Sequence, residues 1–157
     1  SKKENANDYI MIIRGMTNAI KPHTEDCKTK LKVCEKLIEQ GKNTDVPDMK
    51  KIFIKQIIRN LASIVHSRNK IQEIMDMKPP CNTNISLREV ADDMGWSEWL
   101  TPPRLKSVKQ LGITGVMRFL KYLIKNQSPE LSKTHNGYAL NNSNTLAFNT
   151  HSFALPI

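Results

Sequence analysis

Residues 48–77 read DMKKIFIKQIIRNLASIVHSRNKIQEIMDM, and this stretch decides the fold. Its apolar residues recur at intervals of three and four, the period of one face of an α-helix. They are Ile54, Ile57, Ile58, Leu61, Ile64 and Val65, followed by Ile71, Ile74 and Met75. Pro47 stands immediately before the stretch, and proline is favoured in the first turn of a helix. We therefore predict a long central helix from Asp48 to about Met77.

Shorter helices are predicted on both sides of this one. Pro22 should separate two of them, because a proline in a helix interior removes a hydrogen bond and crowds the preceding turn. Ser86 and Glu89 have the spacing of a capping box, which marks a helix start. The predicted flanking helices are Asn7–Ile20, Thr24–Gly41, Ser86–Gly95, Arg104–Leu111 and Thr114–Asn126.

The bulk composition agrees with a helical domain. The chain has 157 residues, enough to bury a core, and 39% of them are hydrophobic. Glycine is scarce, with 6 residues, and no useful length of sequence alternates apolar with polar residues, which argues against an all-β fold. From Gln127 onward the chain is rich in Asn, Ser and Thr and loses its helical periodicity. The prediction is an all-α fold: one bundle of five or six helices in residues 1–126, and an irregular tail in residues 127–157.

Positive charge is concentrated in two stretches that contain no acid, Met49–Gln72 and Trp99–Pro129. The whole chain has a formal charge of +9 and a pI near 9.6. Both stretches also carry apolar residues at helical spacing, so each predicts a helix with one apolar and one basic face. A basic face of this kind favours a polyanion or an acidic partner, although it can also serve only solubility. The candidate phosphate contacts are Lys51, Lys55, Arg59, Arg104, Lys106, Lys109, Arg118, Lys121 and Lys125.

The segment Ile85–Leu100 has a faint helix-turn-helix pattern, with Ala91 four residues before Gly95. In that motif the following helix enters the major groove of DNA. Here the next residues end at Pro102 and Pro103, which would break such a helix within its first turns. We interpret the segment instead as a short capped helix followed by a structural corner built on two tryptophans.

The sequence shows no sign of catalysis, a metal or a cofactor. The four histidines have no metal-ligand spacing with one another or with the cysteines, and no glycine-rich phosphate loop is present. Cys27 and Cys34 lie seven residues apart on one predicted helix, about 10 Å along its axis, too far for a disulfide. The odd cysteine count, including Cys81, indicates a reducing compartment inside the cell. No apolar run is long enough to span a membrane.

These observations predict a non-enzymatic binding module of a larger protein. Its expected ligand is nucleic acid, held through phosphate contacts with little sequence specificity, and its expected location is the nucleus more than the cytoplasm. The alternative is a protein-interaction scaffold that binds a partner through a helical groove or through its tail. The tail is either a linker or a docking peptide, and its candidate partner-binding residues are Phe148, Phe153 and Leu155.

Overall fold

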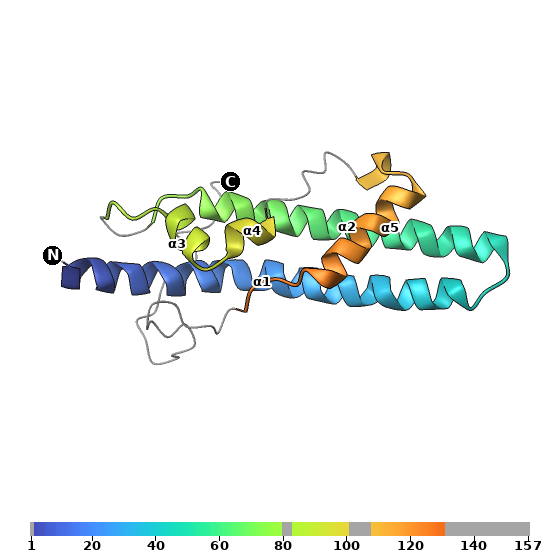
Figure 1. Ribbon diagram of the computed structural model, residues 1–157, viewed down its shortest axis with the longest axis horizontal. Coiled ribbons are helices and arrows are strands. Elements are labelled where there is room, and N and C mark those ends of the chain that lie inside the picture. Colours follow the sequence, from blue (N-terminus) through green and yellow to red (C-terminus); the bar gives the residue numbers. More distant parts are fainter. Residues whose placement is uncertain (1, 80–82, 101–107, 131–157) are drawn as a thin grey trace. The chain divides into compact units, whose positions relative to one another are not determined.

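The structure of the chain is a computed structural model, and it describes residues 2–79, 83–100 and 108–130 (Figure 1). These residues are mostly helical and include no strand, which confirms the predicted all-α class for the described part of the chain. The elements are α1 (Lys2–Lys42), α2 (Pro47–Met75), α3 (Leu87–Asp93), α4 (Trp96–Leu100), a 3₁₀ helix η1 (Val108–Gln110) and α5 (Ile113–Lys125).

The longest helix corrects one prediction. α1 runs without interruption for 41 residues, where the sequence predicted two helices separated at Pro22. An interior proline costs about 3 kcal/mol of helix stability. The side chains that flank it are nevertheless buried: Ile20 is 0% exposed and Thr24 is 2% exposed. The burial of this face on both sides of Pro22 outweighs the local penalty, since tertiary packing routinely overrides helix propensity.

The structure has a helix, α2, at the predicted residues 48–77. It begins at Pro47, with Asp48 in its first turn, where the helix dipole favours an acid. Most of the apolar stripe that predicted the helix is buried, and Ile54, Ile58 and Val65 are partly buried. Its fully or almost fully buried members are Ile57, Leu61, Ile64, Ile71, Ile74 and Met75.

The chain divides into two compact units, and both long helices contribute to each. Unit 1 is made from residues 1–22, 70–102 and 128–157, and unit 2 from residues 23–69 and 103–127. Unit 1 therefore contains the first part of α1, the end of α2, and α3 and α4. Unit 2 contains the rest of α1, the rest of α2, η1 and α5.

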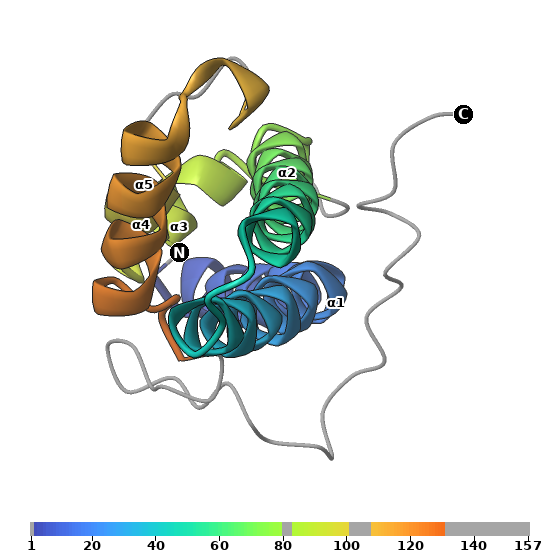
Figure 2. The ribbon, with the colours of Figure 1, turned by 90° about the vertical axis from the view of Figure 1, so that its right-hand side faces the viewer.

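In unit 2, α1 and α2 form an antiparallel helical hairpin joined by residues 43–46. The thiol of Cys34 approaches the carbonyl oxygen of Ile57 at 3.9 Å, and the thiol of Cys27 approaches that of Ile64 at 3.8 Å. As the residue number falls along α1 it rises along α2, which fixes the antiparallel register. Figure 2, an end-on view, shows α5 beside this hairpin.

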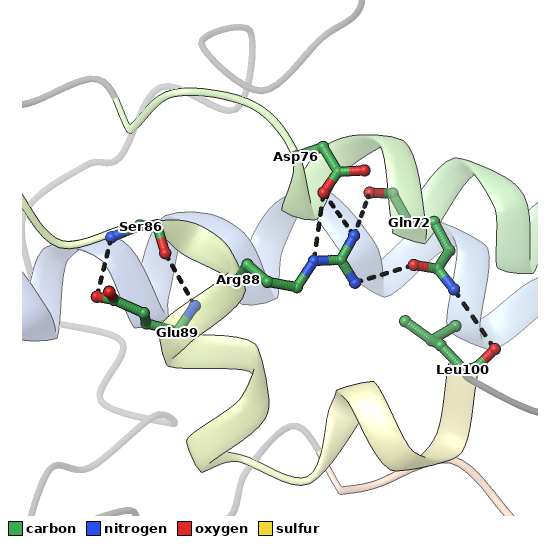
Figure 3. Close-up of polar contacts among 6 residues, drawn as sticks. All are labelled: Gln72, Asp76, Ser86, Arg88, Glu89 and Leu100. Carbon is green, nitrogen blue, oxygen red and sulfur yellow. Dashed lines mark hydrogen bonds and ion pairs between the residues drawn. The ribbon is translucent and has the colours of Figure 1, made fainter.

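In unit 1, the predicted capping box begins α3. The Ser86 hydroxyl accepts a hydrogen bond from the Glu89 amide at 3.0 Å, and the Glu89 carboxylate accepts one from the Ser86 amide at 3.3 Å (Figure 3). After the left-handed Gly95, with φ of 81°, the short helix α4 follows. Its Trp96 and Trp99 rings meet edge to face, with their centres 5.6 Å apart, and both are buried. This arrangement agrees with a structural role for the two tryptophans.

Candidate nucleic-acid interface

The first candidate surface is a row of cations on α2. Lys51, Lys55 and Arg59 are each four residues apart, so they lie on one side of the helix at steps of about 6 Å along its axis. All three are exposed. The side chains of Ile57, Leu61 and Ile64 are buried on the opposite side, and that burial turns the row toward solvent. We call these three residues the α2 row.

The second candidate surface is the polar face of α5. Arg118, Lys121 and Lys125 are spaced by three and four residues and are all exposed. The other face of the helix is packed, and its buried residues are Val116, Phe119, Leu120 and Leu123. These four residues are on the face that helical spacing predicts to be buried, whereas Ile124, predicted on the same face, is 38% exposed. We call Arg118, Lys121 and Lys125 the α5 face.

No described residue neutralises these six cations. Within the part of the chain that the structure describes, none of them makes an ion pair or a side-chain hydrogen bond. Ion pairs join Lys70 to Glu73 and Arg88 to Asp76, and both of these pairs lie in unit 1. The positive charge of the α2 row and the α5 face is thus available to an external anion.

The start of α5 adds backbone donors near this face. Gly112 is the N-cap residue with φ of 49°, a left-handed conformation that glycine adopts without strain, and no side chain caps the first turn. A Cβ atom at Gly115 would lie 2.9 Å from that of Leu111, so glycine is required there as well. The exposed first turn therefore presents uncapped amide groups, which favour anions.

One member of the first acid-free stretch is not on the surface. Arg68 is only 6% exposed, and its side chain shares a hydrogen bond with Tyr122 of α5. Burial lowers the pKa of this guanidinium, while the interaction with Tyr122 acts in the opposite direction. Arg68 therefore joins α5 to α2 and is not a phosphate contact. Its position four residues after Ile64, in the buried stripe, was the signal in the sequence for this role.

A second polar contact that the sequence did not reveal joins α1 to α2. The Ser67 hydroxyl donates a hydrogen bond to Asp26 Oδ2 at 2.8 Å, and the Ser63 hydroxyl lies 3.4 Å from the same oxygen. Ser63 and Ser67 follow Arg59 at the four-residue spacing of the α2 row, so Asp26 is held beside the end of the row that Arg59 forms.

The partition of charge between the two units is uneven. Unit 2 holds 16 of the 24 Lys and Arg residues and 6 of the 15 acids, a formal charge of +10. Unit 1 holds the other 8 cations and 9 acids, a formal charge of −1. The whole positive excess of the chain therefore belongs to the unit that contains the α2 row and the α5 face.

Several predicted site residues lie outside the described part of the chain. These are Arg104, Lys106 and the tail residues Phe148, Phe153 and Leu155. Most of the predicted helix Arg104–Leu111 lies there too, and Val108–Gln110 is seen as the 3₁₀ helix η1. Lys109 belongs to η1, but its side chain is not described.

Other kinds of site were sought in the same residues. Among the described side chains, no group of three or more His, Cys, Asp or Glu residues is arranged to hold a metal ion. None of the described helices combines the length and the apolar character needed to span a membrane. Cys27 and Cys34 are buried free thiols, as the spacing argument predicted.

Comparison with known proteins found no family model, no curated protein and no solved structure that matches this chain.

Proposed function

We propose that unit 2 binds the phosphate backbone of nucleic acid through the α2 row and the α5 face. The observation that carries the proposal is the formal charge of +10 on this unit, together with six exposed cations that have no acidic partner among the described residues. Lysine and arginine that neutralise phosphates release condensed counterions, which drives association.

Binding of this kind is expected to have little sequence specificity. Sequence is read mainly by hydrogen bonds to base edges, and phosphate contacts only position the protein. The α2 row and the α5 face consist of Lys and Arg, and Gln56, which is exposed three residues before Arg59, is an amide beside the row that suits pairing with adenine. Arg59 and Arg118 can reach guanine, but these side chains are too few to read more than about two or three base pairs.

The packing of α5 limits how the two sets of cations can share a ligand. Tyr122 of α5 contacts Arg68, which belongs to the buried stripe of α2 and lies on the side away from the α2 row. This contact does not place the α5 face beside the α2 row. Combining charge reversals on the two helices tests whether one polyanion engages both sets.

The proposal is tested by charge reversal at Lys121 and Lys125 in the full chain. We expect the double variant Lys121→Glu/Lys125→Glu to bind a DNA duplex more weakly and with a shallower salt dependence. Loss of two phosphate contacts reduces the slope of log K against log salt by about 1.8. The readout is fluorescence anisotropy at several salt concentrations, with circular dichroism to verify the helical content.

A matched control is available on α1 in the same unit. Lys32 and Lys36 are exposed and four residues apart, but Glu35 and Glu39 share their surface. Lys32→Glu/Lys36→Glu makes the same change in net charge and should leave the salt slope near that of the wild type. Equal slopes for both double variants would show that the α5 face is not a specific contact surface and would overturn the proposal.

A second candidate function, a protein-interaction scaffold, is favoured by a different observation. Val46, Met49 and Ile52 are 53%, 40% and 45% exposed, and they lie within seven residues at the tip of the hairpin. Clustered exposed apolar residues are typical of protein contact sites. Substituting all three with Ser should abolish binding of a protein partner and leave nucleic-acid affinity unchanged.

Two other expectations stay predictions: the arrangement of all the helices as one bundle around α2, and a nuclear location.

A further inference from the structure

We infer that the ligand of this surface is double-stranded DNA held through its backbone, in preference to single-stranded nucleic acid. The inference rests on the proposed function, and it names the class of polyanion. Three properties of the described residues support it: the burial of the aromatic rings, the spacing of the cations and the scarcity of hydroxyl groups on the cationic faces.

Among the described residues, no aromatic side chain is offered for stacking. Proteins that bind single strands combine a cationic groove with exposed rings on which successive bases stack. No aromatic residue is exposed in the described part of the chain. In unit 2, Phe119 is 5% exposed, Phe53 is half-buried beside Gly41, and Tyr122 is half-buried against Arg68. The surface can therefore contact phosphates but gives unstacked bases no platform.

The cations are arranged as rigid rows, which suits the denser charge of a duplex. Lys51 to Arg59 spans about 12 Å along α2, and Arg118 to Lys125 spans about 10 Å along α5. A DNA duplex carries one negative charge for about every 1.7 Å of its axis, whereas a single strand carries one for about every 3.4 Å. Each row therefore meets a higher charge density on a duplex, although the number of its own contacts stays the same.

The size of the expected preference follows from counterion release. The slope of log K against log salt is about −0.9 for each phosphate contact on a DNA duplex and about −0.7 on a single strand. Six contacts give a difference of about 1.2 in slope. If the affinities converge at 1 M salt, duplex DNA binds about tenfold more tightly than a single strand at 0.1 M salt.

An RNA duplex is not expected to bind more tightly than a DNA duplex, because the surface offers few groups besides its cations. Proteins recognise duplex RNA by its shape and by contacts to the 2′-hydroxyl groups and phosphates. The α2 row and the α5 face are composed of long cations, and Thr114 is the one exposed hydroxyl in line with the described part of the α5 face. Such a surface draws its affinity from phosphates alone and gains little from a 2′-hydroxyl group.

The test uses the full chain with three probes of one mixed sequence: a 20-base-pair DNA duplex, one of its strands, and the corresponding RNA duplex. Affinities are measured by fluorescence anisotropy between 50 and 200 mM NaCl. We expect the DNA duplex to bind about tenfold more tightly than the single strand at 0.1 M salt and with the steeper slope. The RNA duplex should bind no more tightly than the DNA duplex.

The α5 variant gives an independent readout. Lys121→Glu/Lys125→Glu should reduce the difference in affinity between the duplex and the single strand, because it removes contacts that favour the duplex. Lys32→Glu/Lys36→Glu should leave this difference in affinity unchanged. A single strand that binds as tightly as the duplex, or an RNA duplex that binds more tightly than DNA, would overturn this inference and leave the proposed function standing. Failure of the chain to bind any of the three probes would instead overturn the proposed function itself.

Discussion

The guanidinium of Arg88 on α3 is paired with the carboxylate of Asp76, just beyond the end of α2, with Nε 3.2 Å from Oδ1 (Figure 3). The same guanidinium donates a hydrogen bond to Gln72 Oε1 at 2.9 Å. The Gln72 amide in turn lies 3.4 Å from the carbonyl oxygen of Leu100, the last residue of α4. This chain of contacts ties α2, α3 and α4 together within unit 1.

The first prediction concerns the stability that this chain of contacts provides. Arg88→Gln should lower the free energy of unfolding by about 1 kcal/mol, because it removes the hydrogen bonds of the guanidinium to Asp76 and Gln72, whose side chains are partly exposed to solvent. Lys78→Gln, which removes an exposed cation nearby, is the control and should have no measurable effect. Urea denaturation followed by circular dichroism measures both. Equal stability of the two variants would show that the Arg88 contacts contribute nothing.

The second prediction concerns the core of unit 2. Leu61 is 0% exposed and Ile52, on the same helix, is 45% exposed. Leu61→Ala should reduce the free energy of unfolding by about 2–5 kcal/mol, since it leaves a cavity, whereas Ile52→Ala should cost well under 1 kcal/mol. Thermal and urea denaturation of both variants check this. A small loss for Leu61→Ala would mean that the α2 stripe is not a packed core.

The third prediction concerns alkaline pH. Burial raises the pKa of the Cys27 thiol from 9.0 to about 12 and that of Cys34 from 9.0 to about 11. Above pH 9 the unfolded chain loses these protons while the folded chain keeps them, so stability is present in full below pH 9 and falls as the pH rises toward the folded values. Each thiol adds at most about 1.4 kcal/mol per pH unit to this decline.

The variant Cys27→Ala/Cys34→Ala isolates this contribution. Other groups also titrate above pH 9, but they are shared by the two proteins and cancel in the comparison. We expect the free energy of unfolding of the wild type to fall more steeply with pH between 9 and 11 than that of the variant. Urea denaturation at a series of pH values provides the measurement, and parallel curves would contradict the prediction.

The fourth prediction asks whether the α2 row and the α5 face act on one ligand. Lys55→Glu/Arg59→Glu and Lys121→Glu/Lys125→Glu should each reduce the salt slope of duplex binding by about 1.8, and all four changes together by about 3.6. If one pair of changes leaves the slope unaltered, the corresponding helix lies outside the contact surface.

Helical periodicity predicted α2 and α5 to within two residues at each end, because most residues of their apolar stripes are buried. It failed at Pro22, where the local cost of proline is outweighed by packing between residues far apart in sequence. The same limit applies to Asp26 and Ser67, whose hydrogen bond joins residues 41 positions apart. No spacing rule within one helix identifies such a pair.

The sequence predicted which cations are exposed better than it predicted how they are arranged in space. The absence of acids from residues 49–72 and 99–129 identified the exposed cations of α2 and α5. The absence of acids did not distinguish the buried Arg68 from the exposed cations, because charge alone does not tell a buried arginine from an exposed one. It also did not reveal that the positive excess belongs to one compact unit, since each unit is assembled from separate stretches of the chain.

The last prediction concerns the two tryptophans of α4. Trp96 is 0% exposed, Trp99 is 8% exposed, and the two rings pack edge to face in unit 1. Trp96→Ala should lower the free energy of unfolding by about 3–5 kcal/mol, as for other buried large aromatic residues. The Trp96 indole nitrogen has no hydrogen-bond partner among the described residues, so Trp96→Phe loses no bond and should be the milder change.

Because α4 belongs to unit 1, whereas the α2 row and the α5 face belong to unit 2, Trp96→Phe should leave the affinity for a DNA duplex and its salt dependence unchanged. NMR chemical-shift mapping with a DNA duplex then locates the contact surface directly. The largest shifts should fall on residues of the α2 row and the α5 face. Shifts centred on Ser97–Leu100 would instead restore the helix-turn-helix interpretation, in which the segment after Gly95 is the element that enters the groove.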